Sequence, residues 1–414
     1  MRGAALSGRV KPNPLAESGK PLFFPVENDG STGLTAAPAR RAEAVRVCGR
    51  SLSAMQKEAL VVTSRSPGAW RLASDEGAYL AGLDEAPCPL SFFTTGMVSS
   101  YMTQFVAGAA RRGIAIGRVR LVLDSYYTMT GSALKGTMTA GAKPPVLTVE
   151  LESGAGNGVL TALARDAAAA APVNGLLRGS LRSRFSLTHN GRAVPRAHVA
   201  AIERATEPDP GAYFVGAEPR AGTWASLVRR AGKTPRLAHT VTLANDSLAE
   251  QQSRLLHVRG ICTPRADGVL EVEQHLYNPH GSIFHFVCDD AADGRRAPDA
   301  SSYVAAGIAF CFMTQFGRYA AIAKRKLEHC RVTQDIHWSP GAGAAADGEG
   351  AAEPVETHVF VDSAEDDAFA RTLLEMSEQT CFLHALCRTA LQTEVTVREY
   401  RQDAALPEAR APAA

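Results

Sequence analysis

The chain has 414 residues, a length typical of two or three domains. Its 44 basic and 42 acidic residues give a formal charge of +2, which excludes a strongly basic nucleic-acid binder and an acidic tail protein. No apolar run is long enough for a membrane helix, and the N-terminus lacks the apolar segment of a secretory signal. We therefore expect a cytoplasmic protein that binds neither membrane nor nucleic acid.

The first part of the chain changes character near residue 44. Residues 1–43 are rich in Pro, Gly, Ser and Ala without periodicity, and they predict a flexible tail. Residues 44–190 are patterned and predict paired strands, a buried helix, three strands, a helix interrupted near Pro172 and a closing strand. The expected ranges are Leu60–Arg65, Trp70–Ser74, Phe92–Arg112, Val119–Tyr127, Ala133–Thr139, Val146–Leu151, Asn157–Leu177 and Ser183–Thr188.

The second part repeats this order after a break. Several prolines within residues 191–240 predict a linker, and residues 403–414 predict a second tail. Between them, residues 241–402 again predict paired strands, a helix, two strands, a helix and a closing strand. The expected ranges after the paired strands are Ser302–Leu327, Val332–Trp338, Val355–Val361, Ala364–Leu386 and Thr393–Arg398.

The two blocks are similar in sequence as well as in pattern. Thr95–Phe105 reads TGMVSSYMTQF, and Ala306–Phe316 reads AGIAFCFMTQF. The closing strands keep nearly the same register, since Leu181–Leu187 aligns with Leu391–Val397. A sustained internal match of this kind indicates a duplicated α+β unit.

Two cysteines occupy the helices of the second copy. Cys311 lies within its first helix and Cys381 within its second, and we expect these helices to lie side by side. A peroxide-reducing thiol needs a second thiol nearby, which traps the sulfenic acid as a disulfide. The alternative is that both cysteines are small hydrophobic residues of the core.

The motifs around these cysteines resemble those of the OsmC/Ohr family of osmotically inducible and organic-hydroperoxide-resistance proteins. Ala305–Cys311, read as AAGIAFC, is similar to the family motif Ala-Ala-Gly-x-x-x-Cys. The second family motif, Cys-Pro-Val, is divided between the copies. The first copy keeps Pro172-Val173 but has Ala171 at the cysteine position, and the second keeps Cys381.

The resemblance implies a fold and an activity. It implies two tandem repeats, each a curved, mainly antiparallel sheet with two helices, packed together as an intramolecular pseudo-dimer. Cys311 would be the peroxidatic thiol and Cys381 the resolving thiol, and the first copy, with Ser100 and Ala171, would be silent. The implied substrate is an organic hydroperoxide, the implied reductant is a lipoyl or thioredoxin-like dithiol, and no cofactor is expected.

The family also uses a glutamate and an arginine beside the reactive thiol. Serines occupy the glutamate position, as Ser91 in the first copy and as Ser301 or Ser302 in the second. Candidates for the arginine are Arg46, Arg65 and Arg259. These departures leave open a second interpretation, a non-catalytic OsmC-like scaffold or small-ligand-binding protein with inert core cysteines.

A third interpretation invokes a metal. Cys381, His384 and Cys387 have a C-x₂-H-x₂-C spacing, which is suggestive of metal ligands. On one helix these three side chains would diverge, so we expect no metal site.

Overall fold

A computed structural model describes residues 11–26, 33–53, 55–66, 68–196, 198–236, 252–291, 296–341 and 348–401. Within these ranges no helix is both long and apolar enough to cross a membrane. The described elements form two large sheets, two long central helices and several shorter peripheral helices. The predicted α+β class is therefore confirmed.

The first sheet has the strand order β1-β4-β3-β2-β15-β17-β8-β10, with β16 and β9 pairing at its side. Its strands are β1 (Phe23–Val26), β2 (Glu43–Ser53), β3 (Gln56–Thr63), β4 (Ala69–Ser74), β8 (Arg184–His189), β9 (Arg192–Ala193), β10 (Ala200–Ala201), β15 (His329–Ser339), β16 (Ala351–Ala352) and β17 (Glu356–Asp362).

The second sheet has the order β11-β14-β13-β12-β5-β7-β18, with β6 pairing to β5. Its strands are β5 (Val119–Gly131), β6 (Thr139–Ala142), β7 (Val146–Leu151), β11 (Val228–Lys233), β12 (Gln252–Pro264), β13 (Leu270–Asn278), β14 (Ser282–Cys288) and β18 (Glu394–Glu399).

Each sheet is built from both sequence repeats. In the first sheet, β2 of the first repeat pairs antiparallel with β15 of the second. In the second sheet, β12 of the second repeat pairs antiparallel with β5 of the first. The closing strands also cross over, since β8 pairs parallel with β17 and β18 pairs parallel with β7. The repeats therefore pack as an intramolecular pseudo-dimer with exchanged strands.

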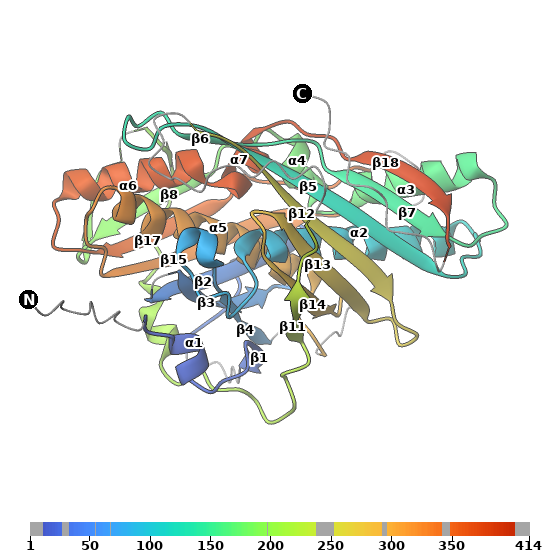
Figure 1. The fold of residues 1–414 in the computed structure, drawn as a ribbon, viewed down its shortest axis with the longest axis horizontal. Coiled ribbons are helices and arrows are strands. Elements are labelled where there is room, and N and C mark those ends of the chain that lie inside the picture. The colour runs from blue at the N-terminus through green and yellow to red at the C-terminus, as the bar shows by residue number, and fades with distance from the viewer. Residues whose placement is uncertain are drawn as a thin grey trace, which may run out of the picture.

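Helices complete the fold as α1 (Pro14–Glu17), η1 (Ala78–Leu80), α2 (Pro89–Arg111), α3 (Asn157–Ala170), α4 (Asn174–Arg178), η2 (Pro210–Phe214), α5 (Ala300–Ile322), α6 (Asp367–Thr380) and α7 (Phe382–Arg388). The corresponding helices α2 and α5 run through the middle of the molecule (Figure 1). Figure 1 also shows α3 with β7 and β18 at one end of the long axis, and α6 with β17 and β8 at the other.

Two equivalent glycines allow the central helices to approach closely. A Cβ on Gly96 would lie 2.5 Å from the carbonyl oxygen of Ala300, and a Cβ on Gly307 would lie 2.8 Å from the backbone nitrogen of Phe93. Contacts of this length are too short for any side chain, so glycine is required at both positions. Both helices are apolar on nearly every face because neighbouring elements cover them on all sides.

The structure differs from the sequence prediction in the terminal segment and the linker. Residues 11–26 do not behave as a tail, because β1 pairs with β4 and buries Phe23 and Phe24 completely. Flanking Pro, Gly and Ser residues obscure this short apolar run. Residues 191–236 are likewise more than a linker, since they contribute β9, β10 and β11 to the two sheets.

Two predicted elements in the body of the chain were also wrong. Of the strand expected over Ala133–Thr139, only Thr139 is in a strand, as the first residue of β6. Residues 133–138 form the connection from β5, which ends at Gly131 with a positive φ of 88°. The single helix expected over Ala364–Leu386 is two helices, α6 and α7, separated by Cys381 in an extended conformation.

Candidate active site

The thiols of Cys311 and Cys381 are both buried and lie close enough to interact in the core. Cys311 projects from the middle of α5, and Cys381 occupies the extended residue between α6 and α7. The Cys381 thiol and the backbone N–H of Leu383 in α7 both interact with the sulfur of Cys311. All eight cysteines are free thiols in this structure. The break between α6 and α7 therefore turns the Cys381 thiol toward α5.

Burial dominates the chemistry of Cys311. Desolvation raises the pKa of the Cys311 thiol well above its usual value, and the contact with Cys381 raises it further. The N–H of Leu383 opposes this shift, because a hydrogen bond to the sulfur favours the thiolate.

A carboxylate from the first repeat stands beside Cys311. Glu76 follows β4, and its Oε1 accepts a hydrogen bond of 2.9 Å from Thr314 Oγ1, one turn beyond Cys311. Its Oε2 accepts a second bond of 2.8 Å from the hydroxyl of Tyr79. Burial raises the pKa of Glu76, while Lys57 and these hydrogen bonds oppose the shift.

A lysine also lies near Glu76 and Cys311. Lys57 lies on β3, is buried, and donates a 2.6 Å hydrogen bond from Nζ to the carbonyl of Met55. Burial lowers the pKa of Lys57, whereas Glu76, Asp75 and Cys311 act in the opposite direction through their charges. Lys57 and Cys311 therefore lie close enough for their charges to affect each other.

The three arginines suggested by the sequence face other carboxylates. Arg46 pairs with Asp335 at 2.8 Å, and Arg259 pairs with Asp124 at 2.7 Å. Arg65 lies 3.8 Å from Asp290. None is among the main causes of the pKa shift of Cys311.

The serines at the family's glutamate position also bond elsewhere. Ser91 lies 3.2 Å from the sulfur of Cys88, and Ser301 donates a 3.0 Å bond to Glu43. Ser302 lends its backbone N–H to Asp299 at 2.7 Å. The carboxylate beside Cys311 is instead Glu76, which was missed because it lies in the other repeat, outside the motifs that surround the two cysteines. The equivalent Ser100 and Ala171 are buried and supply no thiol.

The proposed metal ligands do not converge. The His384 ring packs against Phe312 at 4.8 Å and Phe185 at 5.3 Å between centroids. Burial lowers the pKa of His384 to about 4, so the ring is neutral at physiological pH. Cys381 faces Cys311 instead. In the described part of the chain no three His, Cys, Asp or Glu side chains are grouped in a way that could hold a metal ion.

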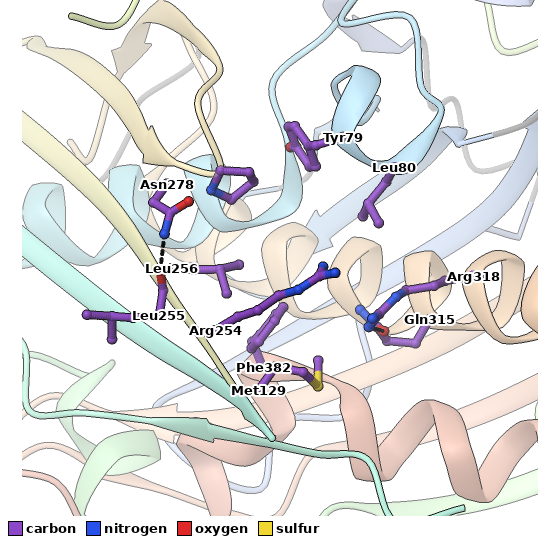
Figure 2. A pocket seen from close by; sticks show the side chains of 11 residues that line it. Tyr79, Leu80, Met129, Arg254, Leu255, Leu256, Asn278, Gln315, Arg318 and Phe382 are labelled. Carbon is purple, nitrogen blue, oxygen red and sulfur yellow. Dashed lines mark hydrogen bonds between the residues drawn. The ribbon is translucent and has the colours of Figure 1, made fainter. Parts of the chain in front are cut away.

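A pocket of about 60 Å³ is lined by chain neighbours of the two cysteines, although neither cysteine is part of its wall. Phe382, the residue after Cys381, forms part of its wall, as do Gln315 and Arg318 from α5. Arg254 of β12 reaches into it from the opposite side (Figure 2).

Comparison with known proteins identifies a family for part of the chain. Residues 292–396, which span α5 to β18 and both cysteines, match the family described as OsmC-like protein. The chain therefore contains an OsmC-like domain, and the family resemblance is confirmed. Among solved structures, an OsmC-like hydroperoxide resistance protein from Jannaschia sp. CCS1 is 26% identical, covering 31% of this chain and 81% of that chain, with a TM-score of 0.19. No curated protein matches the chain.

Proposed function

We propose that this chain reduces organic hydroperoxides with Cys311 as the peroxidatic thiol and Cys381 as the resolving thiol. The observation that carries this proposal is the interaction of the two thiols in the core, with Phe382, the residue after Cys381, lining a nearby pocket. The match of residues 292–396 to the OsmC-like family supports the same class of substrate.

The reaction balances with the groups present and an external dithiol. The Cys311 thiolate attacks the distal peroxide oxygen, so that an S–O bond forms, the O–O bond breaks and the alkoxide leaves as an alcohol after taking a proton. The Cys381 thiol then condenses with the sulfenic acid, forming the disulfide and releasing water. A lipoyl or thioredoxin-like dithiol reduces the disulfide and is itself oxidised.

The buried charges define a role for the first repeat in this reaction. The ammonium group of Lys57 would stabilise the Cys311 thiolate, and Glu76 would hold Lys57 in place while accepting hydrogen bonds from Thr314 and Tyr79. Both groups come from β3 and the segment after β4, so the site is shared by the two repeats.

One observation favours the non-catalytic interpretation. The strongly raised pKa of Cys311 keeps the group as a thiol near neutral pH, and a buried thiol of this kind reacts slowly. In that case the pocket would bind a ligand without turnover.

Steady-state turnover of cumene hydroperoxide with a dithiol reductant separates the two interpretations. We expect Cys311→Ser to reduce the rate to background and Cys381→Ser to consume one equivalent of peroxide without turning over. Cys262→Ala is the matched control, because this buried thiol lies on β12 and contacts Ser99 instead. Full activity of Cys311→Ser, or no activity of the wild-type chain with either dithiol, would refute the proposal.

A further inference from the structure

The pocket lined by Gln315, Arg318 and Phe382 combines apolar and cationic side chains. Apolar side chains form most of its wall, yet two guanidinium groups enter it, from Arg254 on β12 and Arg318 on α5. Figure 2 shows the two arginines pointing toward one another across the pocket, with Phe382 and Met129 on one side. None of the lining residues is acidic.

Arg318 is buried with weak partners. Its Nη1 donates a 3.3 Å hydrogen bond to the amide oxygen of Gln315, and its Nη2 lies 3.5 Å from the sulfur of Met138. Its Nε has no hydrogen-bond partner, and no carboxylate forms an ion pair with it, among the residues that the structure describes. A buried guanidinium without a carboxylate is costly, because the charge has lost its water.

The second arginine adds to this cost. Burial and the charge of Arg254 together lower the pKa of Arg318 to about 10, while the charge of Glu76 acts in the opposite direction. Glu76 is itself engaged by Thr314, Tyr79 and Lys57. An anion placed between the guanidinium groups would relieve their repulsion and satisfy the donors of Arg318.

The pocket is positioned to act on a molecule that reacts at Cys311. Gln315 and Arg318 lie one and two turns beyond Cys311 on α5, on the same face of the helix. Phe382 directly follows Cys381. A ligand held by the arginines would therefore contact residues that neighbour both cysteines.

The two repeats provide an internal comparison. Met313–Phe316 and Met102–Phe105 have the same sequence, MTQF, so the helices can be aligned without gaps. In this alignment Ala107 stands opposite Arg318, and Ser100 stands opposite Cys311. The guanidinium of α5 thus occurs in the repeat that has the thiol and is absent from the equivalent helix position of the repeat that lacks it.

We propose that the pocket selects short hydroperoxides that carry a carboxylate, which Arg254 and Arg318 bind while the peroxide group lies at Cys311. This inference rests on the proposed function and names its substrate class. A volume of about 60 Å³ accommodates a carboxylate and a few carbons, since one water needs about 10–15 Å³ on the same measure. The carboxylate is unchanged in the reaction, and the peroxide is reduced to the hydroxy acid as described above.

The test compares an acid with its neutral ester. We would measure kcat/KM for 4-hydroperoxy-4-methylpentanoate and its methyl ester at pH 7.5 with a dithiol reductant. Charge-assisted hydrogen bonds predict that the wild-type chain prefers the acid by about tenfold or more. Arg318→Met should bring the acid-to-ester ratio close to one. Arg325→Met should keep the wild-type ratio, because Arg325 lies outside the pocket and pairs with Glu365.

A binding experiment keeps this inference separate from the reaction itself. The Cys311→Ser variant would be titrated by calorimetry with 4,4-dimethylpentanoate and, separately, with its methyl ester. We expect the carboxylate to bind and the ester not to bind. The double variant Cys311→Ser/Arg318→Met should bind neither. Turnover with equal kcat/KM for acid and ester would overturn the substrate assignment while the peroxidase function stands. Carboxylate binding without turnover of any hydroperoxide would overturn the proposed function and the substrate assignment, leaving an anion-binding pocket.

Discussion

At the scale of single residues, the reactivity of Cys311 is set by opposing neighbours. Burial and the Cys381 thiol disfavour its thiolate, while Lys57 and the N–H of Leu383 favour it. The balance gives a raised pKa, so the thiolate fraction at neutral pH is small and increases as the pH rises.

This balance predicts a pH dependence of Cys311 modification. The rate of reaction with a peroxide should rise continuously from pH 6 to pH 9, because each step in pH increases the thiolate fraction. Lys57→Met should move the profile to higher pH and slow the reaction at pH 7.5 by about tenfold. Stopped-flow fluorescence of the reduced protein would measure the reaction rate at each pH, and thermal unfolding would check that the variant is folded. A pH-independent rate, or an unchanged profile in the lysine variant, would be incompatible with this role of Lys57.

A second buried carboxyl predicts a stability effect. Glu43 accepts hydrogen bonds from Ser301 at 3.0 Å and from Trp338 at 2.9 Å, and burial raises its pKa to about 7. Between the ordinary value of 4.5 and this value the folded chain binds more protons than the unfolded chain. The free energy of unfolding therefore falls as pH rises through this window.

Glu43→Gln removes the loss of stability that ionisation of the buried Glu43 carboxyl causes at higher pH. The difference in unfolding free energy between the variant and the wild type should shift in favour of the variant as the pH rises from 5 to 8. The shift should be up to about 3 kcal/mol. Urea unfolding at the two pH values measures the difference. Asp166→Asn, at an exposed pair with Arg112, should shift stability by about 0.5 kcal/mol or less at either pH. A Glu43→Gln effect that is the same at both pH values would contradict a raised pKa.

At the scale of elements, the break between α6 and α7 shapes the site. The sequence predicted the equivalent interruption in the first repeat from Pro172, and α3 indeed ends at Ala170. In the second repeat Phe382 replaces that proline, and the pattern reads as one helix. The helix ends at the equivalent position in both repeats, with or without the proline. The prediction failed because the interruption seen in the first repeat was not carried over to the second.

The crossing of α2 and α5 gives a test at the same scale. Gly96→Ala would place a Cβ 2.5 Å from the carbonyl of Ala300, so the helices must separate. We expect a loss of about 1–3 kcal/mol in unfolding free energy, as for other overpacked core sites. Gly158→Ala on α3 is the control: its Cβ meets nothing within 4 Å, and the variant should be neutral or slightly stabilised. Equal stabilities of the two variants would contradict a close helix crossing.

At the scale of the whole molecule, the repeat pattern predicted the architecture but not the composite site. Internal similarity between Thr95–Phe105 and Ala306–Phe316 was sufficient to predict two copies with central helices. The contact between Glu76 and Thr314 joins residues from different repeats, and no periodicity or motif records such a pairing. The burial of Lys57 near Cys311 was not predicted either, because a lysine on a strand ordinarily indicates a solvated face.

The exchanged strands predict that neither repeat folds alone. Residues 1–240 and 241–414, expressed separately, should be insoluble or unfolded, since β12 then lacks β5 and β15 lacks β2. Co-expression should give a 1:1 complex with a single cooperative unfolding transition, measured by gel filtration and circular dichroism. A monomeric, cooperatively folded second half would show that the sheets do not depend on exchange.

The most direct test of the central proposal is to map disulfides after peroxide treatment. The reduced wild-type chain would be incubated with one equivalent of cumene hydroperoxide, digested under non-reducing conditions and analysed by peptide mass spectrometry. The proposed reaction predicts one Cys311–Cys381 disulfide per chain, reversed by a dithiol, with the other six cysteines still reduced. Cys311 and Cys381 recovered as free thiols, while the peroxide remains unconsumed, would contradict it.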